Sequence, residues 1–79
     1  MTGKHHNWHK AWSRTGSGRL RHISGLEFEH DAVLGWSTCD DTLAEYQAHE
    51  LARGVPLHDL VERGRRLLRE AQEWHARNP

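Results

Sequence analysis

The sequence predicts a small α+β protein in which an N-terminal antiparallel β-hairpin or three-stranded sheet packs against a C-terminal helical hairpin. The first third of the chain is rich in Gly, Ser, Thr and aromatic residues, whereas the rest is rich in Ala, Leu, Glu and Arg. Residues 26–30 alternate apolar and polar side chains, and residues 57–74 repeat apolar or small side chains at helical spacing. With 79 residues, we expect a single domain, 1–79, whose core is of marginal size.

The strands are expected within residues 8–30. Thr15-Gly-Ser-Gly18 is typical of a turn and separates residues 8–14 from residues 19–24, so these two segments predict a hairpin. Ser24-Gly25 predicts a tight turn or bulge before the alternating segment 26–30. Residues 1–7 are expected to be flexible, and residues 31–36 to mark the change from strands to helices.

Residues 37–77 are predicted to form two helices. The first is expected at about residues 39–53, because Asp40 and Asp41 suit the positive end of a helix dipole and Arg53-Gly54 is a typical helix end. The side of this helix that faces the core is predicted to carry Leu43, Ala44, Ala48 and Leu51.

The second helix is expected at about residues 56–76, beginning at Pro56. Its apolar and small residues are spaced by three and four, as in a heptad repeat. This core or oligomer seam consists of Leu57, Leu60, Gly64, Leu67, Ala71 and Trp74. Small residues allow a close approach, so we expect a tight helix crossing near Gly64. Because the core is small and the seam is long and regular, the seam also fits an interface between two copies of the chain.

The formal net charge is zero, but the charges are separated along the sequence. Residues 1–26 carry five Lys or Arg and no acid, whereas residues 27–79 carry six Arg and eleven Asp or Glu, giving charges of +5 and −5. The basic segment can attract a phosphate or an acidic partner. Alternatively, it can pair with the protein's own acidic residues.

A nucleic-acid interface is the second functional hypothesis. In strand register, aromatic and basic side chains would alternate on one face, so that rings could stack on bases and cations could meet phosphates. The residues of this interface are Trp8, Lys10, Trp12, Arg14, Arg19 and Arg21. The spacing of the two tryptophans fits a helix equally well, and both rings can instead belong to the core or to a dimer interface.

Catalysis, metal binding and cofactors have little support in the sequence. The eight histidines include His5, His6 and His9, but they do not combine with Cys39 in a recognised ligand spacing. Asp40 and Asp41 lie beside Cys39 and disfavour its thiolate, so we expect a structural cysteine. We therefore expect no catalytic, cofactor or metal site, and a protein that is not an enzyme.

The leading hypothesis is a small binding or regulatory module that acts through contacts with an unidentified protein partner and with a second copy of itself. No segment has the order of a signal peptide or the length of a membrane span. The single cysteine cannot form an internal disulfide. We therefore expect a cytoplasmic protein without a membrane partner.

Overall fold

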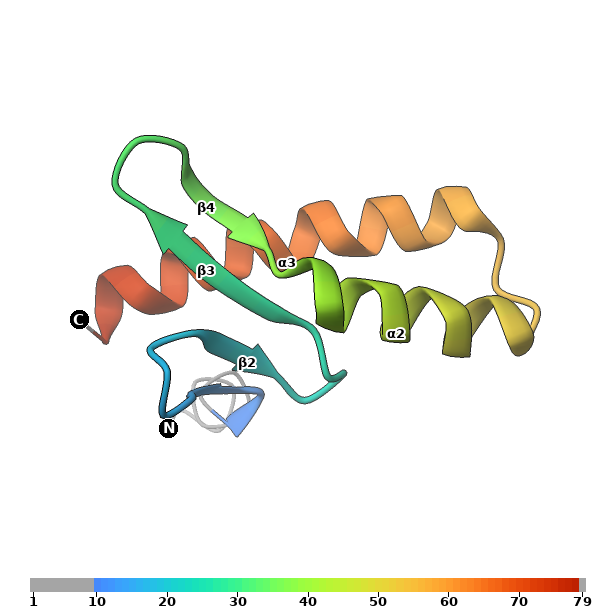
Figure 1. Ribbon diagram of the computed structural model, residues 1–79, viewed down its shortest axis with the longest axis horizontal. Coiled ribbons are helices and arrows are strands. Elements are labelled where there is room, and N and C mark those ends of the chain that lie inside the picture. Colours follow the sequence, from blue (N-terminus) through green and yellow to red (C-terminus); the bar gives the residue numbers. More distant parts are fainter. Residues whose placement is uncertain (1–9, 79) are drawn as a thin grey trace, which may run out of the picture.

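The computed structural model describes residues 10–78 and confirms the α+β class (Figure 1). Four strands form one antiparallel sheet in the order β1-β2-β3-β4, and two helices follow. The elements are β1 (Trp12–Arg14), β2 (Leu20–His22), β3 (Glu27–Asp31), β4 (Gly35–Thr38), α2 (Asp40–Ala52) and α3 (Leu57–Arg77). The prediction for residues 1–7 lies outside the described residues.

The strand region agrees with the predicted turns but differs at its ends. Gly18 donates its N–H to the carbonyl oxygen of Thr15 at 3.0 Å, and Gly25 donates to that of His22 at 2.9 Å. Both predicted turns are therefore present. Lys10 and Ala11 do not belong to a strand, so β1 begins at Trp12 rather than at residue 8.

The fourth strand was not predicted. The sequence predicts two or three strands and a change to helices at residues 31–36, but β4 returns along β3, with Trp36 opposite His30. The Asp31 Oδ1 atom accepts the N–H groups of Val33 and Leu34 at 2.7 and 2.9 Å, and Gly35 has a φ of 82°. This turn closes a β3–β4 hairpin.

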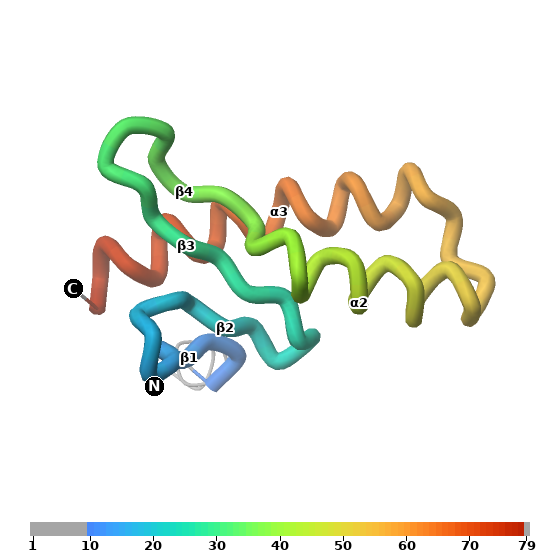
Figure 2. Tube along the Cα trace, in the orientation of Figure 1, coloured from blue at the N-terminus to red at the C-terminus, as the bar shows by residue number. Residues whose placement is uncertain are grey.

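The core lies between the inner face of the sheet and the C-terminal half of α3. In Figures 1 and 2 this half of α3 crosses behind the strands, whereas its N-terminal half lies beside α2. Trp36 is half-buried and packs against the edge of this core. The buried cluster consists of Trp12, Leu20, Leu26, Phe28, Leu67, Ala71 and Trp74.

The predicted inner side of α2 is wrong for three of its four residues. Leu43 packs against the core, but Ala44, Ala48 and Leu51 are exposed. The buried side chain of α2 is that of Glu50. Most of α2 extends beyond the sheet and lies beside α3 (Figure 1). The side of α2 that faces α3 therefore carries Tyr46 and Glu50, not the alanines.

The α3 seam is divided between two environments. Leu60, Leu67, Ala71 and Trp74 are buried, but Leu57 is exposed. The tight crossing expected near Gly64 is absent, because a Cβ atom built on Gly64 has no neighbouring atom within 4 Å. The N-terminal half of α3 is therefore covered less closely than the heptad spacing suggests.

Replacement of Gly64 with alanine is expected to raise the free energy of unfolding by about 0.5–1 kcal/mol, because alanine favours the helix and the site has room for the methyl group. Gly54 is the matched control. It has a φ of +91°, so Gly54→Ala should be destabilising. Urea denaturation of both variants measures the two effects. A loss of stability in Gly64→Ala would mean that a neighbouring segment does approach this position.

Candidate functional site

The expected aromatic and basic strand face does not form among the described residues. Trp12 is buried in the core, where its ring centroid lies 5.6 Å from that of Phe28. A ring in this position is not available to stack on a base. Lys10 is exposed but precedes the strand, and Trp8 lies outside the described residues.

Arg14 is held at the C-terminal end of α3. It donates hydrogen bonds to the backbone oxygen of Asn78 and, at 3.1 Å, to Nδ1 of His75. Its guanidinium carbon also lies 5.4 Å from the centroid of the Trp74 ring. Because the C-terminal end of a helix carries partial negative charge, this position favours a cation. Arg14 therefore joins β1 to α3.

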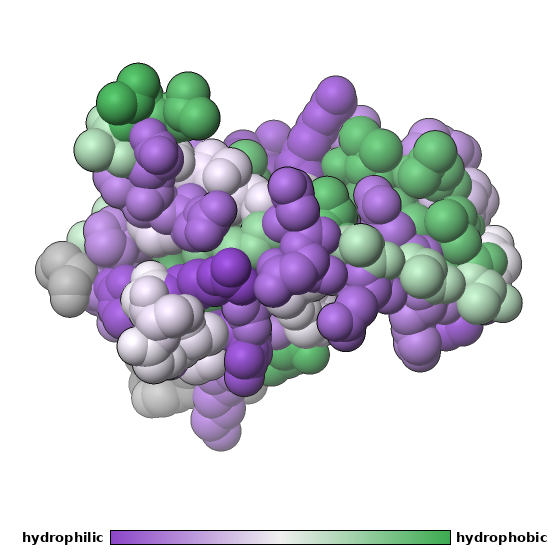
Figure 3. Space-filling view, viewed as in Figure 1, coloured by the Kyte–Doolittle hydropathy of each residue, from purple (hydrophilic) through white to green (hydrophobic). Residues whose placement is uncertain are grey.

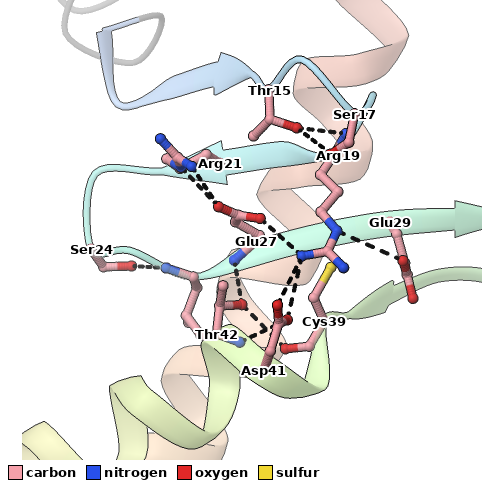
Figure 4. A network of polar contacts seen from close by, with 11 residues as sticks. Thr15, Ser17, Arg19, Arg21, Ser24, Glu27, Glu29, Cys39, Asp41 and Thr42 are labelled. Atoms are coloured by element: carbon pink, nitrogen blue, oxygen red, sulfur yellow. Dashed lines mark hydrogen bonds and ion pairs between the residues drawn. The ribbon is translucent and has the colours of Figure 1, made fainter.

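Arg19 and Arg21 lie on the outer face of the sheet, in a network of acidic residues (Figure 4). Arg19 Nη1 contacts Glu27 Oε1 at 3.1 Å and Asp41 Oδ2 at 3.3 Å, and Arg19 Nε lies 3.9 Å from Glu29. Arg21 Nη2 contacts Glu27 Oε2 at 2.8 Å. The Arg21 and Arg19 guanidinium groups lower the pKa of Glu27.

This network fastens the start of α2 to the sheet. The Glu27 N–H donates to Thr42 Oγ1 at 3.1 Å, and the Thr42 hydroxyl donates to the Cys39 carbonyl at 3.1 Å. The backbone N–H of Thr42 and the Arg19 side chain lower the pKa of Asp41. Arg19 and Arg21 thus pair with the protein's own acidic residues. They share no surface with Trp12 and Arg14, which belong to the inner face of the sheet.

Cys39 lacks the environment of a nucleophile. Its side chain is buried, and burial raises the pKa of the thiol to about 11. Within residues 10–78, no group of three or more His, Cys, Asp or Glu side chains is placed to hold a metal ion. His5, His6 and His9 lie outside the described residues.

A pocket of about 630 Å³ lies between the turn at Ser24 and the two helices, and it borders the buried Glu50. The Glu50 carboxylate accepts hydrogen bonds from Arg53 at 2.8 Å, from Arg63 at 3.0 Å and, with a suitable tautomer, from His49 at 3.0 Å. Burial alone would raise the pKa of Glu50, but these partners outweigh it and lower the pKa. Glu50 therefore joins the two helices by ionic contacts.

The exposed apolar side chains of the helical hairpin form a surface that we call the hairpin surface. The exposed fractions of Leu51, Leu57 and Val61 are 47, 56 and 41%. The exposed Ala44 and Ala48 extend this surface along α2. Figure 3 shows apolar side chains gathered at this end of the molecule. The large members are Leu51, Leu57 and Val61. These residues are apolar, but their helical spacing does not indicate which of them remain exposed.

A second apolar site, which we call the strand tip, is the turn between β3 and β4. Val33 and Leu34 are 89 and 83% exposed there. Neither residue was predicted to have a functional role. Asp31 and Gly35 favour a turn and flank the short apolar segment, so the sequence did contain a signal for an exposed apolar turn.

Comparisons with protein-family models, curated protein sequences and solved structures found no match. No helix within residues 10–78 is long and apolar enough to cross a membrane.

Proposed function

We propose that this protein is a non-enzymatic binding module that acts through protein–protein contacts and forms a homodimer. The observation that carries the proposal is the exposed hairpin surface of Leu51, Leu57 and Val61. Clustered apolar side chains on a small protein are a common mark of an interaction site.

The contact between α2 and α3 supports this proposal. Arg63 contacts both Glu50, at 3.0 Å, and the Tyr46 hydroxyl, at 3.4 Å, so polar groups join the two helices. That contact leaves the large apolar residues Leu51, Leu57 and Val61 exposed. A second polypeptide that covers them would add apolar burial, which a domain of this size lacks.

A binding role also suits the chemistry of the polar residues. The Cys39 thiol is buried with a raised pKa, and the polar side chains around Glu50 bind one another. A catalytic site would need a nucleophile or base aimed at a free space. A cytoplasmic location is part of the proposal, because a single buried cysteine suits a reducing compartment.

The double substitution Leu57→Ser and Val61→Ser tests this proposal. Each half-exposed side chain should contribute about 1 kcal/mol when it is covered. The dimer dissociation constant should therefore rise at least roughly 30-fold. Sedimentation velocity over a concentration series measures this constant. Leu57 and Val61 are exposed in the isolated chain and do not belong to its core. The circular dichroism spectrum of the variant should therefore match that of the native protein.

The matched control is Gln72→Ser with Glu73→Ser, on the exposed side of the C-terminal half of α3. This variant should associate like the native protein. A native protein that stays monomeric at millimolar concentration would contradict the homodimer. Equal dissociation constants for the native protein and the Leu57/Val61 variant would contradict the role of the hairpin surface.

A further inference from the structure

Two apolar sites lie at opposite ends of the molecule. The strand tip, Val33 and Leu34, projects at one end of the long axis, and the α2–α3 connection forms the other end (Figure 1). In Figure 3 apolar side chains gather at both ends of the same upper edge of the molecule. A second copy that lies along this edge in the opposite direction would bring each strand tip to the other copy's hairpin surface.

The strand tip is already ordered in the single chain. The Asp31 carboxylate accepts the N–H groups of Val33 and Leu34 at 2.7 and 2.9 Å, and β3 and β4 are paired up to Asp31 and Gly35. A turn that is fixed before association loses little conformational freedom when it binds. Val33 and Leu34 can therefore act as anchors that need no rearrangement.

The sequence segments that carry the two sites have formal charges of opposite sign. Residues 27–41 contain five acidic residues and no Lys or Arg, a formal charge of −5, and Arg19 and Arg21 contact three of these acids. Asp31, beside the strand tip, has no Lys or Arg partner among the described residues. Residues 49–66 contain four Arg against three acids, a formal charge of +1, although Arg53, Arg63 and Arg65 already contact Glu50 or Glu62. Opposite charges at two apolar sites favour their pairing over the pairing of like sites.

We propose that two copies associate antiparallel about a two-fold axis, with the strand tip of each copy on the hairpin surface of the other. This proposal rests on the homodimer proposed above and specifies its interface. Stable interfaces bury about 800 Å² on each partner, which is more than two apolar side chains supply. Two-fold symmetry makes the same contact twice, so it doubles the buried area and leaves neither apolar site uncovered.

The experiment uses two variants of the full chain. The tip variant carries Val33→Ser and Leu34→Ser, and the hairpin variant carries Leu57→Ser and Val61→Ser. Either variant alone loses both contacts, so its dissociation constant should rise at least roughly 30-fold above the native value. An equimolar mixture should form a heterodimer at least about fivefold more tightly than either variant forms its own dimer. The hairpin variant keeps a native strand tip, and the tip variant keeps a native hairpin surface. One of the two contacts therefore remains in the mixed dimer.

Sedimentation velocity with one variant fluorescently labelled measures the mixed dimer. The other arrangements give different results. Native-like dimerisation of the tip variant, with loss in the hairpin variant, would indicate contact between two hairpin surfaces; it would overturn this arrangement and leave the homodimer intact. Oligomers that grow with concentration would indicate an open chain of tip-to-hairpin contacts and would also overturn it. A monomeric native protein would contradict both proposals.

Disulfide crosslinking is a second measurement. A chain carrying Leu34→Cys and Val61→Cys should form a crosslinked dimer under mild oxidation, because these positions would meet in both contacts. Cys39 is buried and should not compete. The control chain carries Leu34→Cys and Gln72→Cys and should crosslink at least tenfold more slowly. Equal rates in the two chains would overturn the proposed arrangement.

Discussion

Replacement of Phe28 with alanine is expected to lower the free energy of unfolding by about 3–5 kcal/mol. Phe28 is fully buried in β3, opposite Leu20 of β2 and Thr38 of β4, and its ring lies against that of Trp12. Alanine would leave a cavity between the sheet and α3. A domain of this size has a total stability of about 4–12 kcal/mol, so the variant should be partly unfolded at 25 °C.

Urea denaturation monitored by circular dichroism measures this loss. Ile23→Ala is the matched control, because it also removes a large apolar side chain, but one that is 77% exposed. Its effect should stay within about 0.5 kcal/mol. Both proteins should be measured at low concentration, where self-association does not add stability. Similar losses in the two variants would contradict the position of Phe28 in the core.

Replacement of Glu27 with glutamine is expected to lower the free energy of unfolding at pH 7 by about 1.5 kcal/mol, the lower end of the range for hydrogen bonds to charged groups. Glu27 is buried, and it contacts Arg19 at 3.1 Å and Arg21 at 2.8 Å. The two arginine side chains are 30 and 56% exposed, and water therefore screens part of the interaction.

The same substitution should change how stability depends on pH. Arg21 and Arg19 lower the pKa of Glu27 in the folded protein below its unfolded value. The stabilising effect of Glu27 is therefore fully present above the unfolded pKa, about 4.3, and is lost as the pH falls through the folded pKa. The native protein should lose stability from about pH 5 downwards, and the loss should be smaller in Glu27→Gln.

Urea denaturation at several pH values between 7 and 3 measures this difference. Glu29→Gln is the control, because Glu29 is half-exposed and lies 3.9 Å from Arg19. It should cost less than about 0.5 kcal/mol and leave the pH dependence close to that of the native protein. Asp41, Asp31 and Glu50 also have lowered pKa values, so some acid sensitivity should remain in every variant. Identical pH dependence in the native protein and Glu27→Gln would contradict the role of the network.

Local patterns in the sequence predicted much of the fold. The alternation at residues 26–30 corresponds to β3, and the predicted helices 39–53 and 56–76 lie close to α2, Asp40–Ala52, and α3, Leu57–Arg77. These features depend on side-chain periodicity and on turn-forming and helix-ending residues, which act over a few positions. The strand β4 was missed because Gly35-Trp-Ser-Thr38 is short and mixes the strand-favouring Trp and Thr with Gly and Ser, so that its strand structure depends on pairing with β3.

The candidate sites depended more on long-range packing. The sequence indicated that Arg19 and Arg21 could pair either with a ligand or with the protein's own acids, and the sheet register placed both beside Glu27. It identified the apolar residues of the second helix but not that Leu57 and Val61 stay uncovered. Likewise, it did not predict that Glu50 is the side chain that α2 buries.

Local residue patterns were sufficient to predict the α+β class, the two main turns, the approximate ends of the helices and the separation of charge along the chain. The packing of the elements was needed to show which charges pair, which side of α2 faces inward and which apolar residues remain exposed at the strand tip and the hairpin surface. Burial and ion pairing depend on the partner across a contact, which local patterns do not identify. In this chain those partners lie on other elements, often many positions away in the sequence.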